Sequence, residues 1–307
     1  CLLIAYGSGG AGAEAAKVAL PNLPRAQSHC LRNFTVLTWT DVLADRGEEI
    51  MPVWCDFLNR AERLKPATAL SLGKDEGEVE EISYRAKGQG PTVILLPMLL
   101  SASQWDPIVN QLASDYCVIS LGGRHLGGVA FIDGRGRDPG YIRAVRSHVD
   151  EIEIQPGETI LDVGCGPGTL DRWLARRTNG ANPIQSVDIN GYFLREAATL
   201  VEAEGLQDII TFGKGNAEDL PFPENNFDIV MSHTVMEECD ADKMLAEMIR
   251  VAKPGGRVAV MVRATDRRSL WNMSLNDTVR EIVETPVTSV GVRGCADVSL
   301  YSRFGKS

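Results

Sequence analysis

The sequence contains no apolar run that is long enough to cross a membrane. A membrane-spanning helix needs about 18–20 consecutive apolar residues, and no stretch of the 307-residue chain approaches that length. The first five residues, Cys1 to Ala5, are apolar but follow no basic segment, so no secretory signal peptide is evident. We therefore predict a cytoplasmic chain without a membrane span.

Positive charge is scarce relative to negative charge. The chain has 31 Lys and Arg residues against 41 Asp and Glu residues, and its formal net charge is −10. A protein that binds DNA or RNA needs a basic face to neutralise phosphates, so this balance argues against nucleic acid as the main partner. Hydrophobic content of 44% and charged content of 23% are ordinary for a globular protein, and the length predicts two units.

The seven cysteines lack the pattern of a disulfide framework or a zinc site. They are scattered, and no pair has C-x-x-C spacing. An odd set of this kind predicts free thiols in a reducing compartment. The motif G-x-S-x-G is also absent from the sequence, which excludes the serine nucleophile elbow of a hydrolase. We predict neither a metal centre nor a serine nucleophile.

One glycine-rich stretch dominates what the sequence does contain. Thr159 to Val163 is a short apolar run interrupted by Asp162, and Gly164, Gly166 and Gly168 follow at alternate positions. Hydrophobic residues then recur at helical spacing. Glycine allows positive φ and close approach of a ligand, and a helix start presents free N–H groups. The order of strand, glycine turn and helix therefore predicts a ligand site at the carboxyl end of the strand.

Four further strand-like segments follow, and helix-like segments separate them. The strands are expected over 184–189, 209–212, 227–232 and 257–262, and a helix over 141–152 precedes the first strand. Strands that alternate with helices form parallel sheets with right-handed crossovers. The predicted fold class is therefore α/β, with a doubly wound and mostly parallel sheet.

Polar residues follow three of these strands at the predicted ligand edge. Asp188 ends the second strand, where a carboxylate accepts hydrogen bonds from both hydroxyls of a ribose. Asn216 follows the third strand, and His233 follows the fourth. Enzymes that use NAD place an acid where Asp188 stands, so this residue alone leaves the nucleotide class open.

Three motifs in this order resemble the ubiquinone/menaquinone-type branch of class I S-adenosylmethionine (SAM)-dependent methyltransferases, over about residues 141–263. Asp162 with Gly164-Cys165-Gly166-Pro167-Gly168 resembles motif I of that family, whose G-x-G-x-G spacing differs from the dinucleotide fingerprint G-x-G-x-x-G. Asn216-Ala217-Glu218 resembles its adenine-binding turn. Lys253-Pro254-Gly255-Gly256 resembles its tight turn before the fifth strand.

The resemblance implies a Rossmann-like sheet and SAM as the cofactor. Tyr141 is included among the cofactor contacts because, in many small-molecule methyltransferases, the helix before motif I covers the SAM pocket. The cofactor site that the resemblance implies consists of Asp162, Gly164, Cys165, Gly166, Gly168, Asp188, Ile189, Asn216, Ala217, Glu218, His233 and Tyr141.

His233 is the predicted catalytic residue. The resemblance places the end of the fourth strand against the methionine part of SAM and the incoming acceptor, where a histidine acts as a base or contacts the acceptor. A base is needed only when the acceptor must lose a proton, and a strand-end histidine without chemistry is an equal alternative. The predicted acceptor is a small molecule: a quinone, a polyketide or a lipid-like compound.

Two other functional interpretations stay open. The first is a SAM-binding or interaction domain of a larger fused protein, without catalysis. It is motivated by the C-terminal part, where 271–283 and 296–304 look helical and the sixth and seventh strands of a complete family member are not evident. We expect either a cut C-terminus or a sheet that is completed in another way. The second is a nicotinamide oxidoreductase, which the glycine spacing and the Asn216 turn disfavour.

The chain is divided into three parts: 1–88 as an N-terminal segment of uncertain fold, 89–140 as a β-α-β accessory segment with a linker, and 141–307 as the methyltransferase domain. Residues 91–121 show a strand, an amphipathic helix and a second strand, and they faintly resemble the opening of an α/β-hydrolase. Residues 74–81 are predicted as a loop or linker, and 122–140 as a flexible connection. The sequence does not indicate an oligomeric state.

Overall fold

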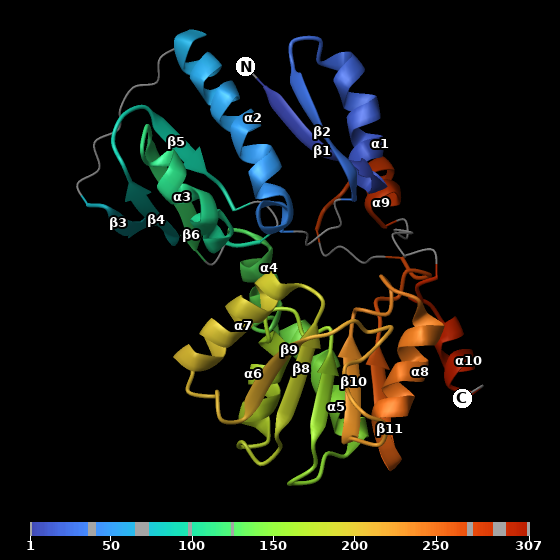
Figure 1. Ribbon diagram of the computed structural model, residues 1–307. Helices are drawn as coiled ribbons and strands as arrows, with labels where there is room; N and C mark the ends of the chain where they lie inside the picture. Colours follow the sequence, from blue (N-terminus) through green and yellow to red (C-terminus); the bar gives the residue numbers. More distant parts are fainter. Residues whose placement is uncertain are drawn as a thin grey trace. The chain divides into compact units, whose positions relative to one another are not determined.

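The protein divides into two compact units, Cys1–Gly134 and Arg135–Ser307 (Figure 1). A computed structural model describes residues 2–35, 41–64, 74–97, 100–123, 126–268, 273–284 and 293–305. Each unit has hydrophobic clusters of its own. None of the helices in these described ranges is long and apolar enough to cross a membrane.

Unit 2 is built on a five-stranded sheet. All four neighbouring strand pairs are parallel, in the order β11-β10-β7-β8-β9. This confirms the predicted α/β class and the predicted strand positions. The strands are β7 (Ile160–Val163), β8 (Ile184–Asp188), β9 (Ile210–Lys214), β10 (Phe227–His233) and β11 (Ala252–Met261).

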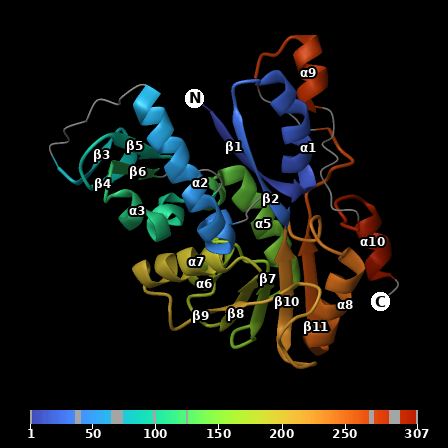
Figure 2. The ribbon, with the colours of Figure 1, turned by 45° about the horizontal axis from the view of Figure 1, so that its top comes forward.

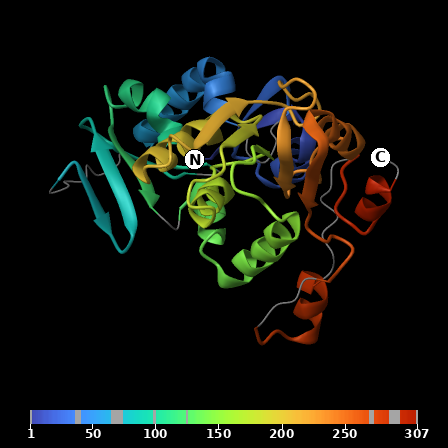
Figure 3. The same ribbon diagram turned by 90° about the horizontal axis from the view of Figure 1, so that it is seen from below.

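Helices cover both faces of this sheet (Figure 3). Because side chains alternate along a strand, Ile160 packs in a cluster with residues of α5, α6 and α7, whereas Leu161 packs in a second cluster with residues of α8. Strands that are buried on both faces read as continuous apolar runs, which explains why the sequence revealed them. The helices are α5 (Pro139–Ile152), α6 (Thr169–Arg177), α7 (Gly191–Ala203) and α8 (Ala241–Val251).

A polar clamp holds the amino ends of the central strands. The Asp228 carboxylate accepts hydrogen bonds from the Thr159 N–H at 2.9 Å, the Thr159 hydroxyl at 2.7 Å and Lys253 Nζ at 2.8 Å. These hydrogen bonds, led by that from Lys253, lower the pKa of Asp228 to about 2. Lys253 begins the predicted tight turn, but the structure places these residues inside β11. The pairing of β10 with β11 shifts register there, between Phe227 and Ile229.

The C-terminal segment closes one edge of this unit without adding a described strand to the five-stranded sheet. Ala296 is buried, and its carbonyl accepts hydrogen bonds from the Thr265 N–H at 2.8 Å and the Thr265 hydroxyl at 2.9 Å. The predicted helices are shorter than expected: α9 spans Asp277–Glu284 and α10 spans Ser299–Phe304. Residues 271 and 272 of the first prediction lie outside the described residues.

Unit 1 contains two smaller sheets. In the first, β1 (Leu3–Gly9) and β2 (Gln27–Thr35) are parallel and α1 (Gly10–Ala19) connects them (Figure 2). The second has the order β3-β4-β6-β5 and contains the predicted strand–helix–strand segment, which is confirmed by parallel pairing of β5 with β6. This segment consists of β5 (Thr92–Leu95), α3 (Asp106–Leu112) and β6 (Cys117–Gly123), and α2 (Val42–Leu64) packs against α3.

The prediction of a loop over 74–81 is wrong. Glu76–Val79 forms β3, which pairs antiparallel with β4 (Ile82–Lys87). All four residues of β3 are exposed, since the strand lies at the edge of its sheet, and charged residues are common on edge strands. Because β4 pairs with β6, this sheet extends across the predicted domain boundary at residue 88.

The prediction of a flexible connection over 122–140 is also wrong for its described part, and residues 124 and 125 lie outside the described residues. Gly128–Arg135 forms α4, in which Val129 is buried, and α5 begins at Pro139. The glycines around residues 128–134 hid an apolar segment that packs as a helix. Asp138 then caps α5, because its side chain accepts a hydrogen bond from the Tyr141 N–H at 2.7 Å.

Candidate functional site

The glycine loop leaves the carboxyl end of β7 as predicted. Gly164, Gly166 and Gly168 all adopt positive φ, at 80°, 55° and 68°. The N–H groups of Gly164 and Cys165 both donate to the Val187 carbonyl, at 2.8 and 3.1 Å, so the loop stays attached to β8. Gly168 is the N-cap of α6. The loop therefore connects the central strand to a helix start, as a ligand site of this fold requires.

Asp188 lies directly beside this loop. Its Oδ2 accepts a hydrogen bond from the Gly166 N–H, and its Oδ1 accepts one from the Asn190 N–H, both at 2.8 Å. Burial raises the pKa of Asp188, and these hydrogen bonds act in the opposite direction. The next side chain, Ile189, is 65% exposed. A fixed carboxylate and an exposed apolar side chain thus lie together at the ligand edge.

The Asn216 turn reaches the same edge. The Gly215 N–H donates to the Asp188 carbonyl at 3.1 Å, and Asn216 Oδ1 accepts a hydrogen bond from the Glu218 N–H at 3.0 Å. Glu218 accepts at Oε1 from the Asp240 N–H, at 2.9 Å, so its carboxylate braces the start of α8. Ala217 packs against the core cluster on the α8 face. The turn is braced, and Asn216 is its exposed polar residue.

His233 ends β10, next to the glycine loop. It follows Ser232, whose hydroxyl donates to the Val163 carbonyl at 2.7 Å. The His233 side chain is buried, and both ring nitrogens are without a hydrogen-bond partner. Burial, with a smaller contribution from His148, lowers the pKa of His233 to about 3. At neutral pH the imidazole is therefore uncharged and has unused hydrogen-bonding capacity.

His148 is a site residue that the sequence did not reveal. It lies on α5, and its ring meets that of His233 edge to face, with centroids 5.1 Å apart and planes at 88°. Its Nε2 is also buried without a hydrogen-bond partner. The sequence could have indicated His148 by its spacing, because it lies seven residues after Tyr141 and on the same helix face as the buried Val145.

Tyr141 and Cys165 lie near the buried acids of the loop. Burial raises the pKa of the Tyr141 hydroxyl, Arg135 lowers it, and Asp162 raises it further. The Arg135 guanidinium lies 5.4 Å from the centre of the Tyr141 ring. Burial, together with Asp171, Asp162 and Asp188, raises the pKa of the Cys165 thiol well above its usual range. Cys165 is therefore a protonated thiol and not a nucleophile.

Asp162 belongs to a buried polar cluster beneath the loop. It lies opposite Ser186 in the β7–β8 register, and both are buried together with Asp171 of α6. Burial and the neighbouring Asp171 raise the pKa of Asp162 well above its usual range. Burial also raises the pKa of Asp171 to about 6, although Asp162, Ser186 and Arg172 act in the opposite direction. Asp162 thus supports the loop from below.

We expect Asp171→Asn to stabilise unit 2 at pH 8 more than at pH 4.5. The pKa of Asp171 rises from 3.8 to about 6 on folding, so its protonated form contributes stability below pH 3.8 that is lost as the pH rises through 6. Removing the titration gains up to about 3 kcal/mol at pH 8. The free energy of unfolding is measured in urea, with hydrogen exchange of peptides from β7 and β8 as the signal. Asp208→Asn, which changes an exposed acid, is the control. A gain that does not change with pH would contradict the assignment.

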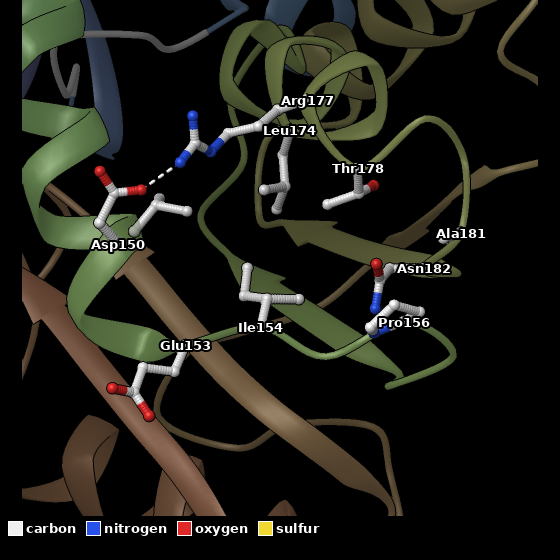
Figure 4. Close-up of a pocket in the computed structure, with 10 residues that line it drawn as sticks. Asp150, Glu153, Ile154, Pro156, Leu174, Arg177, Thr178, Ala181 and Asn182 are labelled. Carbon is white, nitrogen blue, oxygen red and sulfur yellow. Dashed lines mark hydrogen bonds and ion pairs between the residues drawn. The ribbon is translucent and has the colours of Figure 1, made fainter.

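A separate pocket of about 470 Å³ lies away from this edge (Figure 4). Its lining residues come from the last turns of α5 and α6 and from the segments that lead from these helices to β7 and β8, so it lies at the amino ends of these strands. Arg177 pairs with Asp150 at the pocket, and Asn182 Nδ2 donates to the carbonyls of Gln155 and Glu158, at 2.8 and 3.0 Å. Parallel sheets bind ligands at their carboxyl ends, so we do not place the cofactor in this pocket.

The described residues contain no group of three or more His, Cys, Asp or Glu side chains that is arranged to hold a metal ion. The candidate site consists of the glycine loop, Asp188 with Ile189, the Asn216 turn, and the two histidines. It combines the sheet edge at which this fold binds nucleotides with a pair of uncharged imidazoles, of which that of His233 is buried.

Comparison with known proteins finds a likeness to methyltransferases in this region. Residues 161–260 match the family model described as "Methyltransferase domain". Methyltransferase GfsG of Streptomyces halstedii is 30% identical over 156 residues, which are 50% of this chain and 52% of the relative. Demethylmenaquinone methyltransferase of Symbiobacterium thermophilum is 38% identical over 113 residues, 36% of this chain and 45% of the relative.

Further relatives extend this comparison. Ubiquinone/menaquinone biosynthesis C-methyltransferase UbiE of Psychromonas ingrahamii is 34% identical over 121 residues, 39% of this chain and 48% of the relative. The chain spans about half the length of these curated relatives. Among solved structures, the YcgJ protein from Bacillus subtilis has a TM-score of 0.41 and 20% identity, and the match covers 53% of this chain and 67% of that chain.

Proposed function

We propose that the chain transfers the methyl group of SAM to a small-molecule acceptor, because residues 161–260 match the family model described as "Methyltransferase domain". The observation that carries the proposal is the Asp188 carboxylate, held 2.8 Å from the Gly166 N–H at the carboxyl edge of the sheet. This is where a ribose meets an acid in nucleotide-binding α/β folds.

The residues at this edge fit SAM. A side chain built at Gly166 would meet nothing within 4 Å, so the loop leaves open space at this position. The exposed Ile189 offers an apolar contact for a base, and the exposed Asn216 offers an amide. Asp188 would hold the ribose hydroxyls, and the Gly164–Gly168 loop would receive the methionine part, with Tyr141 above it.

When bound, SAM supplies a methyl group on a positively charged sulfur, which is a good leaving group. The chain therefore needs mainly to align the acceptor, exclude water and remove a proton where one is released. His233 is the proposed base or acceptor contact, because it lies buried at the end of β10 with both ring nitrogens without a partner.

The acceptor class is also a proposal. We propose a quinone, polyketide or lipid-like acceptor in the cytoplasm, without nucleic acid as a partner. The acidic net charge of −10 supports this choice. One relative is named a demethylmenaquinone methyltransferase, and another a ubiquinone/menaquinone biosynthesis C-methyltransferase. Demethylmenaquinol, the reduced form of demethylmenaquinone, is therefore the first acceptor to test.

Calorimetric titration of the full chain with SAM, S-adenosylhomocysteine and NAD tests the cofactor. Methyl transfer from isotope-labelled SAM to demethylmenaquinol and to a panel of phenols tests the reaction. Binding of SAM with transfer to any acceptor supports the proposal. Binding without transfer to any acceptor supports instead a catalytically silent SAM-binding domain, and a folded chain that binds no SAM contradicts both.

We expect Ile189→Ala to weaken SAM binding by about 5–10-fold, because covering most of an exposed isoleucine contributes about 1–1.5 kcal/mol. The side chain is 65% exposed, so its truncation removes little packing from the free protein. Val79→Ala is the matched control, since Val79 is an apolar side chain of similar exposure, at 64%, in unit 1. Equal affinities for the two variants would place the cofactor base elsewhere.

A further inference from the structure

We propose that the pocket at the amino ends of β7 and β8 binds a primary ammonium group carried on an apolar chain, as in an aliphatic amine or a lysine side chain. The pocket has a volume of about 470 Å³, a size typical of small-molecule sites, and its lining residues all belong to unit 2 (Figure 4). It lies at the opposite end of the strands from the glycine loop and Asp188. It is therefore a second site, and the inference does not rest on the proposed function.

A buried amide lines one side of the pocket. Asn182 is 1% exposed, and its Nδ2 donates to the carbonyls of Gln155 and Glu158, at 2.8 and 3.0 Å. These two hydrogen bonds fix the orientation of the amide, and Figure 4 shows its oxygen pointing toward Thr178. Within the described residues, Asn182 Oδ1 accepts no hydrogen bond. Since buried acceptors are almost always paired, this oxygen indicates a ligand that donates a hydrogen bond.

Thr178 supplies a second acceptor on the same side of the pocket (Figure 4). Its hydroxyl donates to the Ala175 carbonyl at 3.4 Å, so the lone pairs of Oγ1 are left to accept. A primary ammonium group has three N–H donors and no acceptor, so it can donate to both oxygens at once. A carboxylate has no donor for the amide oxygen. The hydrogen-bonding groups on this side therefore favour an ammonium ion over an anion.

The charge around the pocket also favours a cation. Helices α5 and α6 both end at the pocket, because Glu153 and Thr178 are their C-cap residues. A helix C-terminus carries about half a negative charge. The charged side chains in the lining are two carboxylates and one guanidinium, those of Asp150, Glu153 and Arg177, and the guanidinium is paired with Asp150. The lining is therefore negative overall.

The remaining lining is apolar and suits the chain of the ligand. Val149 and Leu174 are buried, and Ile154 packs against the hydrophobic cluster that contains them. In Figure 4, Ile154 and Leu174 lie next to the side that Asn182 and Thr178 form. Each methylene that is covered there tightens binding by up to about fourfold. The ligand therefore needs the chain as well as the ammonium group, which distinguishes it from an inorganic cation.

Titration of the full chain with pentylamine tests this inference. The readout is the side-chain amide signal of Asn182 and the methyl signals of Ile154 in NMR spectra at constant ionic strength. We expect both residues to shift and the shifts to saturate. Pentanol lacks the charge, pentanoate has the opposite charge and ammonium chloride lacks the chain, so none of these three probes should shift either residue.

Two further titrations define the site and the source of the ligand. Saturation of the chain with S-adenosylhomocysteine should leave pentylamine binding unchanged, because the two sites lie at opposite ends of the strands. Nα-acetyl-lysine methylamide distinguishes the two sources of the ammonium group. Tighter binding of this compound than of pentylamine indicates a lysine side chain of a peptide, and weaker binding indicates a free amine.

Thr178→Val should weaken pentylamine binding by about 10-fold, the effect of one hydrogen bond to a charged group. Thr199→Val is the matched control. The Thr199 hydroxyl also donates to a helix carbonyl, that of Arg195 at 3.0 Å, but it lies on α7 and does not line the pocket. This control variant should bind pentylamine as the parent does.

Arg177→Gln should have the opposite effect. It removes a positive charge from the lining and leaves the Asp150 carboxylate without this partner, so we expect pentylamine affinity to rise by about 2–5-fold, the size of a surface ion-pair effect. Arg176→Gln is the control, because Arg176 pairs with Glu204 and does not line the pocket. Its affinity should not change.

Equal binding of pentanol and pentylamine would overturn the inference, and so would shifts confined to residues outside the pocket. Displacement of the amine by S-adenosylhomocysteine would place it in the cofactor site instead. If Thr178→Val does not fold, Arg177→Gln carries the test, and a fall in affinity there would contradict the inference. A chain that binds pentylamine but neither SAM nor S-adenosylhomocysteine would refute the proposed function and leave this inference standing.

Discussion

Asp188→Ala should weaken SAM binding by at least about 100-fold, because a hydrogen bond to a charged group contributes about 1.5–3 kcal/mol and the ribose offers two. The variant also removes the acceptor for the Gly166 and Asn190 N–H groups, which now donate to the two carboxylate oxygens at 2.8 Å. The glycine loop would lose its connection to the end of β8 at the same time. Calorimetry with SAM and S-adenosylhomocysteine measures the loss.

Two further variants separate charge from geometry at this position. Asp188→Asn keeps one acceptor oxygen, and we expect it to lose about 10-fold, the effect of one weakened charge-assisted hydrogen bond. Asp208→Ala removes an exposed acid from the turn before β9, at the amino end of the strand, and should bind SAM as the parent does. A change of less than about threefold in Asp188→Ala, under 1 kcal/mol, would refute the ribose assignment.

The sheet of unit 2 could be predicted from the sequence for a physical reason. Its strands are buried on both faces, so Ile160, Leu161 and Val163 form an apolar run that a glycine turn ends. Asp188 and His233 could be placed because the carboxyl end of a parallel strand is a fixed position in this fold. Local pattern and global fold agree there, and that agreement made the prediction possible.

The features that sequence reasoning missed depend on tertiary contacts. β3 has a polar, acidic sequence, and only its pairing with β4 makes it a strand. His148 became a site residue because α5 packs its ring against that of His233. Asp171 looks like an ordinary acid in the first turn of α6, but it is buried beside Asp162. The partner of His148 is distant in the sequence, and the partners of β3 and Asp171 are near but follow neither the apolar alternation of a strand nor the apolar spacing of a helix, so no hydrophobic pattern announces these contacts.

The glycine loop offers the second large effect, because its glycines meet different surroundings. A Cβ at Gly164 would lie 2.2 Å from Val235 Cγ2 and 2.9 Å from Val235 Cγ1, and φ there is +80°. A Cβ at Gly166 would meet nothing within 4 Å, at φ +55°. Gly164→Ala therefore combines backbone strain with a clash against a short, branched side chain, whereas Gly166→Ala adds strain alone.

We expect Gly164→Ala to destabilise unit 2 by about 2–5 kcal/mol, the sum of about 1–2 kcal/mol of left-handed strain and about 1–3 kcal/mol of overpacking. Gly157→Ala, at φ +88° with nothing within 4 Å, measures the strain alone. The double variant Gly164→Ala/Val235→Ala should recover the overpacking part as a coupling energy in a double-mutant cycle. The free energy of unfolding of each variant is measured in denaturant, with hydrogen exchange of peptides from β7 as the signal.

Gly166→Ala, unlike Gly164→Ala, should weaken SAM binding more than it lowers the stability of unit 2. Its stability loss should match that of Gly157→Ala, since neither added methyl group meets another atom. Its SAM affinity should fall by about 10-fold or more, because the methyl group would occupy space that close approach of a ligand to a glycine loop requires. If Gly166→Ala binds SAM normally, the open side of the loop is not the cofactor face. If Gly164→Ala is no less stable than Gly157→Ala, the contact with Val235 does not constrain the loop.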